Sequence, residues 1–385
     1  MTNGTTLRQE RTSVRSLIYH ILYEETLNLL TEKPSRPFTR QSLAETVGVS
    51  MPTLYQNLNE LMDEGLVFEA GEEQSTGGRK ARSLDIVPDA RFSVGISVSE
   101  QSLRLVAANL RLEELAYRRI PFDVRACLDG TAPKIAAHLE DFLNEFPLDR
   151  SKLLGVGVTV PGLVSEDHQT LVVAPTLGLS DIPMHQMLGD IPYPVYVDND
   201  GSASGHAECF VRRSSWNMAY LSLENGVGGA VLVGGSPYAG DHNRSGEFGH
   251  ICVEPGGLPC SCGKLGCLEP YCSPLRIVNT FGVTPEEFFQ GVAEHDPEYE
   301  VLLYDMLRHL AVAVNSIRMA LDCDVVLGGF LSEYLAPYLQ ILRNYVLAGN
   351  PFEENADFVQ FSVLRRHITP LGAALYFIRE FVENV

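Results

Sequence analysis

Three cysteines and one histidine lie close together in the chain, and their types are those of metal ligands. The thiols fall between residues 260 and 267, beside two glycines that let the backbone turn tightly around an ion. Thiolate and imidazole groups favour tetrahedral zinc, and four protein ligands leave no open position for catalysis. The expected ligands of this structural zinc are His250, Cys260, Cys262 and Cys267. Cys252 and Cys272 are possible substitutes, and a set of unrelated buried thiols is the competing interpretation.

The elements that hold such a site belong to a longer pattern, which begins with a helix-turn-helix in residues 1–86. Apolar residues recur at three- and four-residue spacing just after Ser13, which predicts an amphipathic helix. Thr39 is expected to cap a short helix, and Gly48 supplies the tight turn. Ser50 is expected to cap a second helix that has Pro52 in its first turn. Two further stretches, 66–69 and 82–86, predict a β-hairpin with a glycine-rich, basic tip.

From Phe92 onward, short apolar strands alternate with helices, which predicts an α/β body in residues 87–385. Two strand-led halves, beginning near Phe92 and near Asn217, predict two similar lobes with a cleft between them. The expected strands are 92–98, 103–109, 153–160, 195–197, 218–223, 230–233 and 325–327, and the expected helices include 132–146, 304–321 and 371–385. Lobe one is expected at 87–198 with helix 371–385, and lobe two at 199–370 with the zinc loop 250–267.

Length and composition limit the class of protein. The 385 residues suit two to three compact units. No apolar run approaches the roughly 18–20 residues that span a bilayer, and the polar N-terminus lacks a signal-peptide pattern. The chain is therefore expected in the cytoplasm, with no membrane partner.

The formal net charge of −20 is unevenly distributed. Residues 1–85 hold nine Lys and Arg against twelve Asp and Glu, a net charge of −3, and the rest holds 20 against 37, a net charge of −17. The nearly neutral head can therefore present a local basic face to nucleic acid, whereas the body is strongly acidic.

Several motifs together resemble the signature of the ROK family, which comprises repressors, open reading frames of unknown role and sugar kinases. They are the Glu-x-Gly-His of 247–250, the Cys-x-Cys-Gly-x-x-Gly-Cys-x-Glu of 260–269, the Pro-Gly turn of 160–164, the Asp-Asn-Asp of 198–200 and the glycine pair of 326–329. Within the family, the chain resembles the group of N-acetylglucosamine and xylose repressors. The resemblance implies a winged helix-turn-helix followed by a two-lobed, actin-like and sugar-kinase-like ATPase fold.

The resemblance also implies a sugar-binding site. Its expected residues are Gly162, Asn199, Asp200, Glu247, His250 and Glu269. Buried sugar hydroxyls need fixed polar partners, because an unpaired buried group costs about 1–3 kcal/mol. His250 is expected to bind zinc through one ring nitrogen and to face a hydroxyl with the other. The alternative for Asn199 and Asp200 is a helix cap without a ligand. Thr176 stands where many family members have Asn, which leaves the identity of the sugar open.

No catalytic residue is expected, although Asp200 is equivalent to the general base of the family's kinases. Family kinases carry Asp-x-Gly-Gly-Thr after the first strand, where this chain has Ser97 and Glu100. The second glycine loop begins with Glu224, and Phe330 follows the late glycine pair. Loss of the phosphate cradle is expected to abolish phosphoryl transfer. The remaining alternatives are a sugar kinase with a regulatory head and a zinc-stabilised interaction module without a ligand.

The expected partners are a double-stranded DNA operator and a sugar or sugar phosphate effector. A homodimer, or a dimer of dimers, would match two heads to two half-sites. The residues expected to face DNA are Thr53, Tyr55, Gln56, Asn57, Arg79 and Lys80, because amides can pair with adenine edges and cations with a narrow minor groove. The competing interpretation is a solvated helix surface or a head that contacts only protein.

Overall fold

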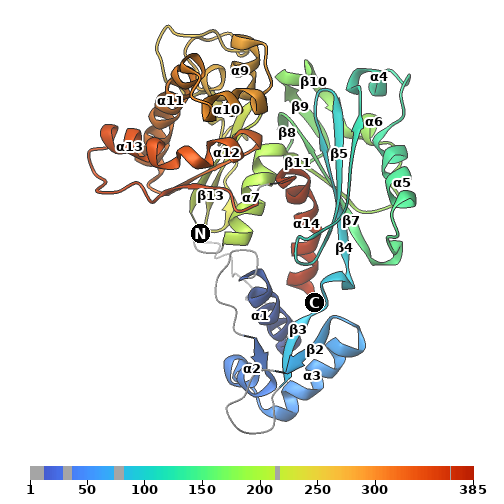
Figure 1. The fold of residues 1–385 in the computed structure, drawn as a ribbon. Coiled ribbons are helices and arrows are strands. Elements are labelled where there is room, and N and C mark those ends of the chain that lie inside the picture. Colours follow the sequence, from blue (N-terminus) through green and yellow to red (C-terminus); the bar gives the residue numbers. More distant parts are fainter. Residues whose placement is uncertain (1–12, 29–36, 73–81, 213–216, 365) are drawn as a thin grey trace, which may run out of the picture. The chain divides into compact units, whose positions relative to one another are not determined.

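The computed structural model describes residues 13–28, 37–72, 82–212, 217–364 and 366–385, which Figure 1 draws as helices and strands. They form two compact units. The first comprises the N-terminal segment to Phe92 with residues 109–113 and 377–385, and the second comprises 93–108 and 114–376. In the described ranges, no helix combines the length and apolarity needed to cross a bilayer.

The helices of the first unit begin where capping residues stand. Ser42 N–H donates to the Thr39 hydroxyl over 3.2 Å, and Thr39 N–H donates to the Ser42 hydroxyl over 2.9 Å. Gly48 ends that helix at φ +74°, and Ser50 caps the next. The predicted caps and turn are therefore confirmed. The helices are α1 (Val14–Asn28), α2 (Arg40–Val47) and α3 (Met51–Asp63).

A small antiparallel sheet completes this part of the first unit. It has the order β1-β3-β2, and its strands are β1 (Phe38–Thr39), β2 (Val67–Glu72) and β3 (Arg82–Ile86). The predicted hairpin is confirmed in β2 and β3, and β1 was not predicted. Arg79 and Lys80 lie outside the described residues.

Segments from far along the chain pack against α1 in the first unit. The Tyr23 hydroxyl donates to the Leu110 carbonyl over 2.6 Å. The ring of Phe381 meets Tyr19 edge-on, with centroids 6.3 Å apart, and Arg91 lies 5.6 Å from the Phe381 ring centroid. The turn at 109–113 and the C-terminal residues therefore form one packed body with α1.

The second unit contains two five-stranded sheets of the same design, which confirms the expected strand-led halves (Figure 1). In each, antiparallel neighbours follow the first strand on one side, and parallel strands continue on the other. One sheet, of order β11-β7-β4-β5-β6, comprises β4 (Phe92–Val98), β5 (Ser102–Asn109), β6 (Glu114–Pro121), β7 (Leu153–Val160) and β11 (Val195–Asn199). The other, of order β14-β13-β12-β15-β16, comprises β12 (Met218–Leu223), β13 (Val227–Val233), β14 (Ser236–Pro237), β15 (Asp324–Gly328) and β16 (Val359–Phe361).

A third, three-stranded antiparallel sheet was not predicted. Its strands are β8 (Leu163–Val164), β9 (Thr170–Ala174) and β10 (Leu179–Pro183). The segment that contains Thr176 connects β9 to β10, so this sheet sets its place.

Helix α14 (Ile368–Asn384) packs so closely in the second unit that glycine is required around it. A methyl group at Gly95 of β4 would lie 1.7 Å from the Pro370 carbonyl oxygen, and one at Gly157 of β7 would lie 1.9 Å from that of Ala373. α14 also meets α7 (Asp200–Arg212), because the hydroxyls of Ser204 and Thr369 form a hydrogen bond of 3.2 Å. The remaining α-helices are α4 (Val124–Leu128), α5 (Ile135–Glu145), α6 (Met184–Leu188), α8 (Glu269–Cys272), α9 (Pro274–Phe281), α10 (Pro285–Ala293), α11 (Pro297–Leu321), α12 (Phe330–Leu335) and α13 (Leu339–Gly349).

Candidate functional site

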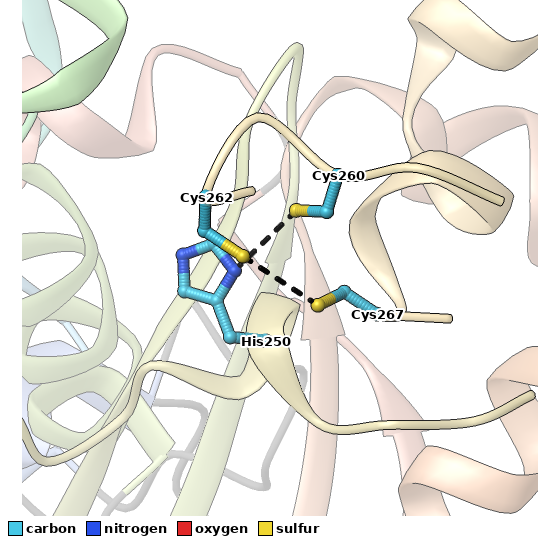
Figure 2. Close-up of side chains that lie close together, drawn as sticks. All are labelled: His250, Cys260, Cys262 and Cys267. Carbon is cyan, nitrogen blue, oxygen red and sulfur yellow. Dashed lines mark hydrogen bonds between the residues drawn. The ribbon is translucent and has the colours of Figure 1, made fainter. Parts of the chain in front are cut away.

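The four predicted metal ligands converge in the second unit (Figure 2). Their candidate ligand atoms all lie within 4.8 Å of one another. The sulfurs of Cys262 and Cys267 are 3.7 Å apart, and His250 Nδ1 is 3.6 Å from the Cys260 sulfur. The loop closes tightly because Gly263 and Gly266 adopt φ of +80° and +81°. Three thiols and one imidazole at these separations form a donor set that fits one tetrahedral metal ion.

The two possible substitutes are not part of this group. The Cys272 thiol is buried and donates to the Met306 carbonyl over 3.4 Å. Cys252 is exposed and lies outside the group of convergent ligand atoms that the described residues form.

The thiols of the loop differ in acidity. Burial raises the pKa of Cys260 and raises that of Cys267 to about 12, whereas the Lys264 N–H lowers the pKa of Cys262. A bound cation favours the thiolates, so metal binding would release protons. The site therefore suits a metal that replaces thiol protons.

Residues 246–269, which form the metal loop, also hold two carboxylates that were predicted to bind a sugar, those of Glu247 and Glu269. His250 Nε2 lies 3.9 Å from Glu247 Oε2, so its Nδ1 faces the thiols while its other nitrogen faces this carboxylate. The Ser261 hydroxyl donates to Glu269 Oε1 over 2.9 Å. The expected contacts of His250 with zinc and with a sugar hydroxyl stay predictions, and Ser261 adds a contact to Glu269 that sequence reasoning missed.

The start of β13, reached from β12 through the turn of residues 224–226, is where the elements of this region meet. A methyl group at Gly201, at the start of α7, would lie 2.8 Å from the Gly229 carbonyl oxygen. One at Gly246 would lie 2.5 Å from the same oxygen, and one at Gly249 would lie 1.9 Å from that of Val227. Backbone from α7 and from the metal loop therefore touches the start of β13 directly.

Backbone donors at this junction already have partners from the chain itself. Gly201 N–H donates to Asp200 Oδ1 over 2.8 Å, and Ser202 N–H donates to Asn199 Oδ1 over 3.0 Å. The Asn199 amide in turn donates to the Gly162 carbonyl over 2.8 Å. Asn199 therefore makes the helix cap that the competing interpretation expects, and it also connects α7 to the Pro-Gly turn.

The electrostatics of the region are dominated by carboxylates. The pKa of Asp200 is raised to about 6, mainly by burial and also by Glu224 and Glu247, although the Gly201 N–H and Arg104 act to lower it. Burial also raises the pKa of Glu224, and Arg104 again lowers it. The Arg104 guanidinium on β5 donates to the Ser97 hydroxyl over 3.5 Å. Sequence reasoning missed Arg104, although a charged residue in an otherwise apolar strand is a usable signal.

The DNA-facing candidates on α3 are placed unequally. Tyr55 and Gln56 are exposed. Thr53 and Asn57 are half-buried and bonded locally, because the Thr53 hydroxyl pairs with that of Ser50 over 2.9 Å and the Asn57 amide donates to the Thr53 carbonyl over 2.8 Å. The Tyr55 ring carries the guanidinium of Arg40 at 4.6 Å from its centroid, which sequence reasoning also missed.

Comparison with known proteins identifies the family. A model of the ROK family matches residues 94–379. The chain belongs to the ROK family.

Among its ROK relatives is the xylose repressor of Bacillus subtilis (strain 168), 29% identical over 358 residues, which cover 90% of this chain and 87% of that protein. The glucokinase of Halalkalibacterium halodurans is 29% identical over 269 residues, which cover 68% of this chain and 78% of that enzyme. A solved ROK family transcriptional regulator, a homolog of the E. coli MLC protein, matches with a TM-score of 0.68 and 20% identity, over 95% of this chain and 97% of its own. That structural likeness shows the fold.

The metal group gives a first prediction. Purified protein is expected to hold about one metal ion per chain, and Cys262→Ser to lose most of it, because a ligand at this tetrahedral site is removed. Affinity is expected to fall as the pH is lowered, since the thiols must release protons. Elemental analysis measures the content, and Cys252→Ser is the matched control because its thiol lies outside the group. Equal metal content in both variants would contradict the assignment.

A second prediction concerns Asp200 and pH. Its pKa in the folded protein, about 6, exceeds the usual 3.8, so the folded state binds more protons than the unfolded state between these values. Stability therefore falls as the pH rises through this window. Asp200→Asn removes the buried charge and is expected to raise the free energy of unfolding by about 1–2 kcal/mol at pH 7.

The difference between Asp200→Asn and the unmodified protein is expected to vanish near pH 4, and thermal melts at each pH measure it. Asp198, whose pKa burial also raises to about 6, titrates in both proteins and cancels in the comparison. Glu333→Gln, at an exposed carboxylate, is the control. A variant that is less stable at pH 7 would contradict the prediction.

Proposed function

We propose that this chain is a sugar-responsive, DNA-binding repressor that acts on genes of carbohydrate uptake or catabolism. The main support for this proposal is the share of the chain over which it resembles a repressor. The likeness to a xylose repressor spans 90% of this chain, whereas the likeness to a glucokinase spans 68%. A relative that extends across most of the chain is the better guide to the role of the N-terminal unit.

We infer that residues 1–86 form a winged helix-turn-helix. The order of α1, α2 and α3, followed by the β2–β3 hairpin, supports it, as does the glycine turn at Gly48. Tyr55 and Gln56 are the exposed candidates on α3, and Gln56 is suited to an adenine edge in the major groove. Arg79 and Lys80 remain wing candidates from the sequence. Because half-sites are read in pairs, the proposed repressor acts as a homodimer or a dimer of dimers.

We further infer that the metal is zinc, held by His250 and the three thiols of its loop. When bound, zinc supplies structural cross-linking, and it fixes the tautomer of His250 so that Nε2 faces the sugar site. The separation of 3.9 Å between Nε2 and Glu247 Oε2 supports this role. The loop then presents Glu247, and through Ser261 it holds Glu269, as acceptors for sugar hydroxyls.

The sugar is proposed to bind where these carboxylates meet the start of α7. Asp200, Glu247 and Glu269 would accept hydroxyl protons, with Asn199 and Gly162 forming the adjoining wall. The shared environment of Asp200, Glu224 and Glu247 supports their convergence on one ligand.

A sugar kinase is the second candidate, because Asp200 keeps the position of the family's general base. Against it, Ser97 replaces the aspartate of the family's first phosphate loop, and the Arg104 guanidinium bonds to it. Phosphoryl transfer depends on a cradle of donors and metal ions at the phosphates. Production of a phosphorylated hexose from ATP and magnesium, lost in Asp200→Asn, would favour the kinase.

Helix α14 is the segment that we propose to carry the sugar signal. In the second unit, its Thr369 bonds to Ser204, whose hydroxyl also donates to the Asp200 carbonyl over 2.7 Å. Tyr376 stacks on Tyr196 of β11 with ring centroids 3.6 Å apart. The last residues of the same helix belong to the first unit, where Phe381 packs against α1. One helix therefore contributes residues to both units, which is the ground for this proposal.

The third prediction separates sensing from DNA binding. Asp200→Ala is expected to bind DNA normally but without response to sugar, because it removes the effector contact together with one local bond to the Gly201 N–H at the start of α7. Gln56→Ala is expected to weaken DNA binding about tenfold while sugar affinity stays unchanged, since it removes a base contact. The test is a titration of the gene's own upstream DNA, with and without a sugar found by thermal shift. DNA affinity that does not fall at saturating sugar would refute the proposed response.

The fourth prediction tests the α14 route. Tyr376→Ala removes the stack on Tyr196 and is expected to leave sugar affinity and sugar-free DNA affinity within about twofold. The weakening of DNA binding by sugar should shrink several-fold, because the coupling free energy between two sites is typically about 1–3 kcal/mol. Tyr376→Phe, which keeps the ring, is the control. Full response in Tyr376→Ala would show that the signal takes another route.

A further inference from the structure

The carboxylates around Asp200 bear on the charge of the effector, given the sugar-binding role proposed above. The carboxylates near Asp200 are those of Glu224 and Glu247, and backbone contacts hold the segments that carry them close together. Gly201, next to Asp200, lies against Gly229, and Gly246, next to Glu247, lies against the same residue. Glu224 begins the turn that leads into β13, the strand that holds Gly229. The acidic groups therefore cannot separate without moving the start of β13.

Anion sites in proteins are made from free backbone N–H groups, most often at helix N-termini and glycine-rich loops. Here those groups donate to the chain's own carboxylates. Phe330 N–H, at the start of α12, donates to Glu224 Oε1 over 3.2 Å. Val227 N–H, at the start of β13, donates to Glu269 Oε2 over 3.1 Å. Gly201 N–H donates to Asp200. A phosphate at this place would have to displace a carboxylate from each donor.

The nearby cation is also engaged. Arg104 lowers the pKa of both Asp200 and Glu224, so its charge is shared between two carboxylates, and it bonds to Ser97. A phosphate monoester carries a charge of about −1.5 to −2 near neutral pH. The positive charge of Arg104 offsets only one of the three carboxylates of Asp200, Glu224 and Glu247. The net charge around Asp200 is therefore negative, and it repels such an ester.

We infer that the effector is an uncharged saccharide with a free hydroxyl against Asp200, and that the phosphate ester of the same sugar is rejected. The hydroxyl donates to the Asp200 carboxylate, whose Oδ1 already holds the start of α7. Replacing that hydroxyl by phosphate places like charges in contact, which specific sites use to exclude wrong ligands. Glu224 is then a specificity-determining residue: it excludes the ester and makes no contact that the free sugar needs.

The experiment compares matched pairs on the full-length, metal-loaded protein. Glucose is paired with glucose 6-phosphate, and N-acetylglucosamine with N-acetylglucosamine 6-phosphate, and xylose is included as a free pentose. Thermal shift and calorimetry measure binding. For the pair whose free sugar binds, the free form is expected to bind at least about a hundredfold tighter than its ester.

Glu224→Gln tests the cause of the discrimination. Its amide oxygen can still accept from Phe330 N–H, so the loop is retained while one negative charge is lost. The preference for the free sugar is expected to shrink about tenfold, mainly through tighter binding of the ester. Glu333→Gln, on an exposed part of α12, removes the same charge away from the junction and should leave the preference unchanged.

The outcomes are distinct. An ester that binds as tightly as its free sugar, or tighter, overturns this inference and leaves the sugar-responsive repressor standing. An unchanged preference in Glu224→Gln overturns the role of Glu224. If neither member of any pair, nor xylose, shifts the melting temperature, the sugar-binding role itself fails, and this inference fails with it.

Discussion

The start of β13 is in backbone contact with α7 and with the metal loop, two of the segments that line the proposed sugar site. Gly201 and Gly246 both lie against the Gly229 carbonyl, and Gly249 lies against that of Val227. A side chain at any of these three positions would collide with backbone, which cannot move aside as a flexible side chain can. These contacts fix how far α7, the metal loop and β13 stand from one another. The positions of Asp200, Glu247 and Glu269 follow from that spacing.

This spacing concentrates negative charge where a related kinase would need to receive phosphate. The chain balances part of the charge internally, through Arg104 and through backbone N–H groups that donate to Glu224 and Glu269. A buried carboxylate of raised pKa is a cost to folding at neutral pH, so Asp200 is a residue that the stability of the fold alone does not explain. Its presence fits the proposed contact with a ligand hydroxyl.

Helix α14 contributes residues to both compact units, with close backbone packing near its start and aromatic contacts near its end. Near its start, the helix backbone lies so close to Gly95 and Gly157 that neither position has room for a side chain. Near its end, Phe381 lies between Arg91 and Tyr19. A rigid, closely packed element transmits displacement better than a loosely packed one, which is why we assign the signal to this helix.

Local signals in the sequence determined a good part of this molecule. The caps at Thr39 and Ser50, the turn at Gly48, the strands at 92–98, 153–160 and 218–223, and the metal set of His250 with three thiols follow from residue types and spacing over a few positions. Each depends on interactions between near neighbours, so each can be read without the fold. The small sheet of β8, β9 and β10 was not predicted, because β10 is partly exposed and its sequence Leu-Ser-Asp-Ile-Pro has no apolar run.

Only the tertiary structure decided which distant groups share an environment. Arg104 and Asp200 are 96 positions apart, and no periodicity relates them. Their electrostatic interaction exists because the fold brings β5 close to the start of α7. The engagement of Val227 and Phe330 N–H by Glu269 and Glu224 is equally invisible in sequence, because it depends on loops from separate strands meeting at hydrogen-bond distance. Sequence determined the kinds of groups present, and long-range packing decided their partners and their charge balance.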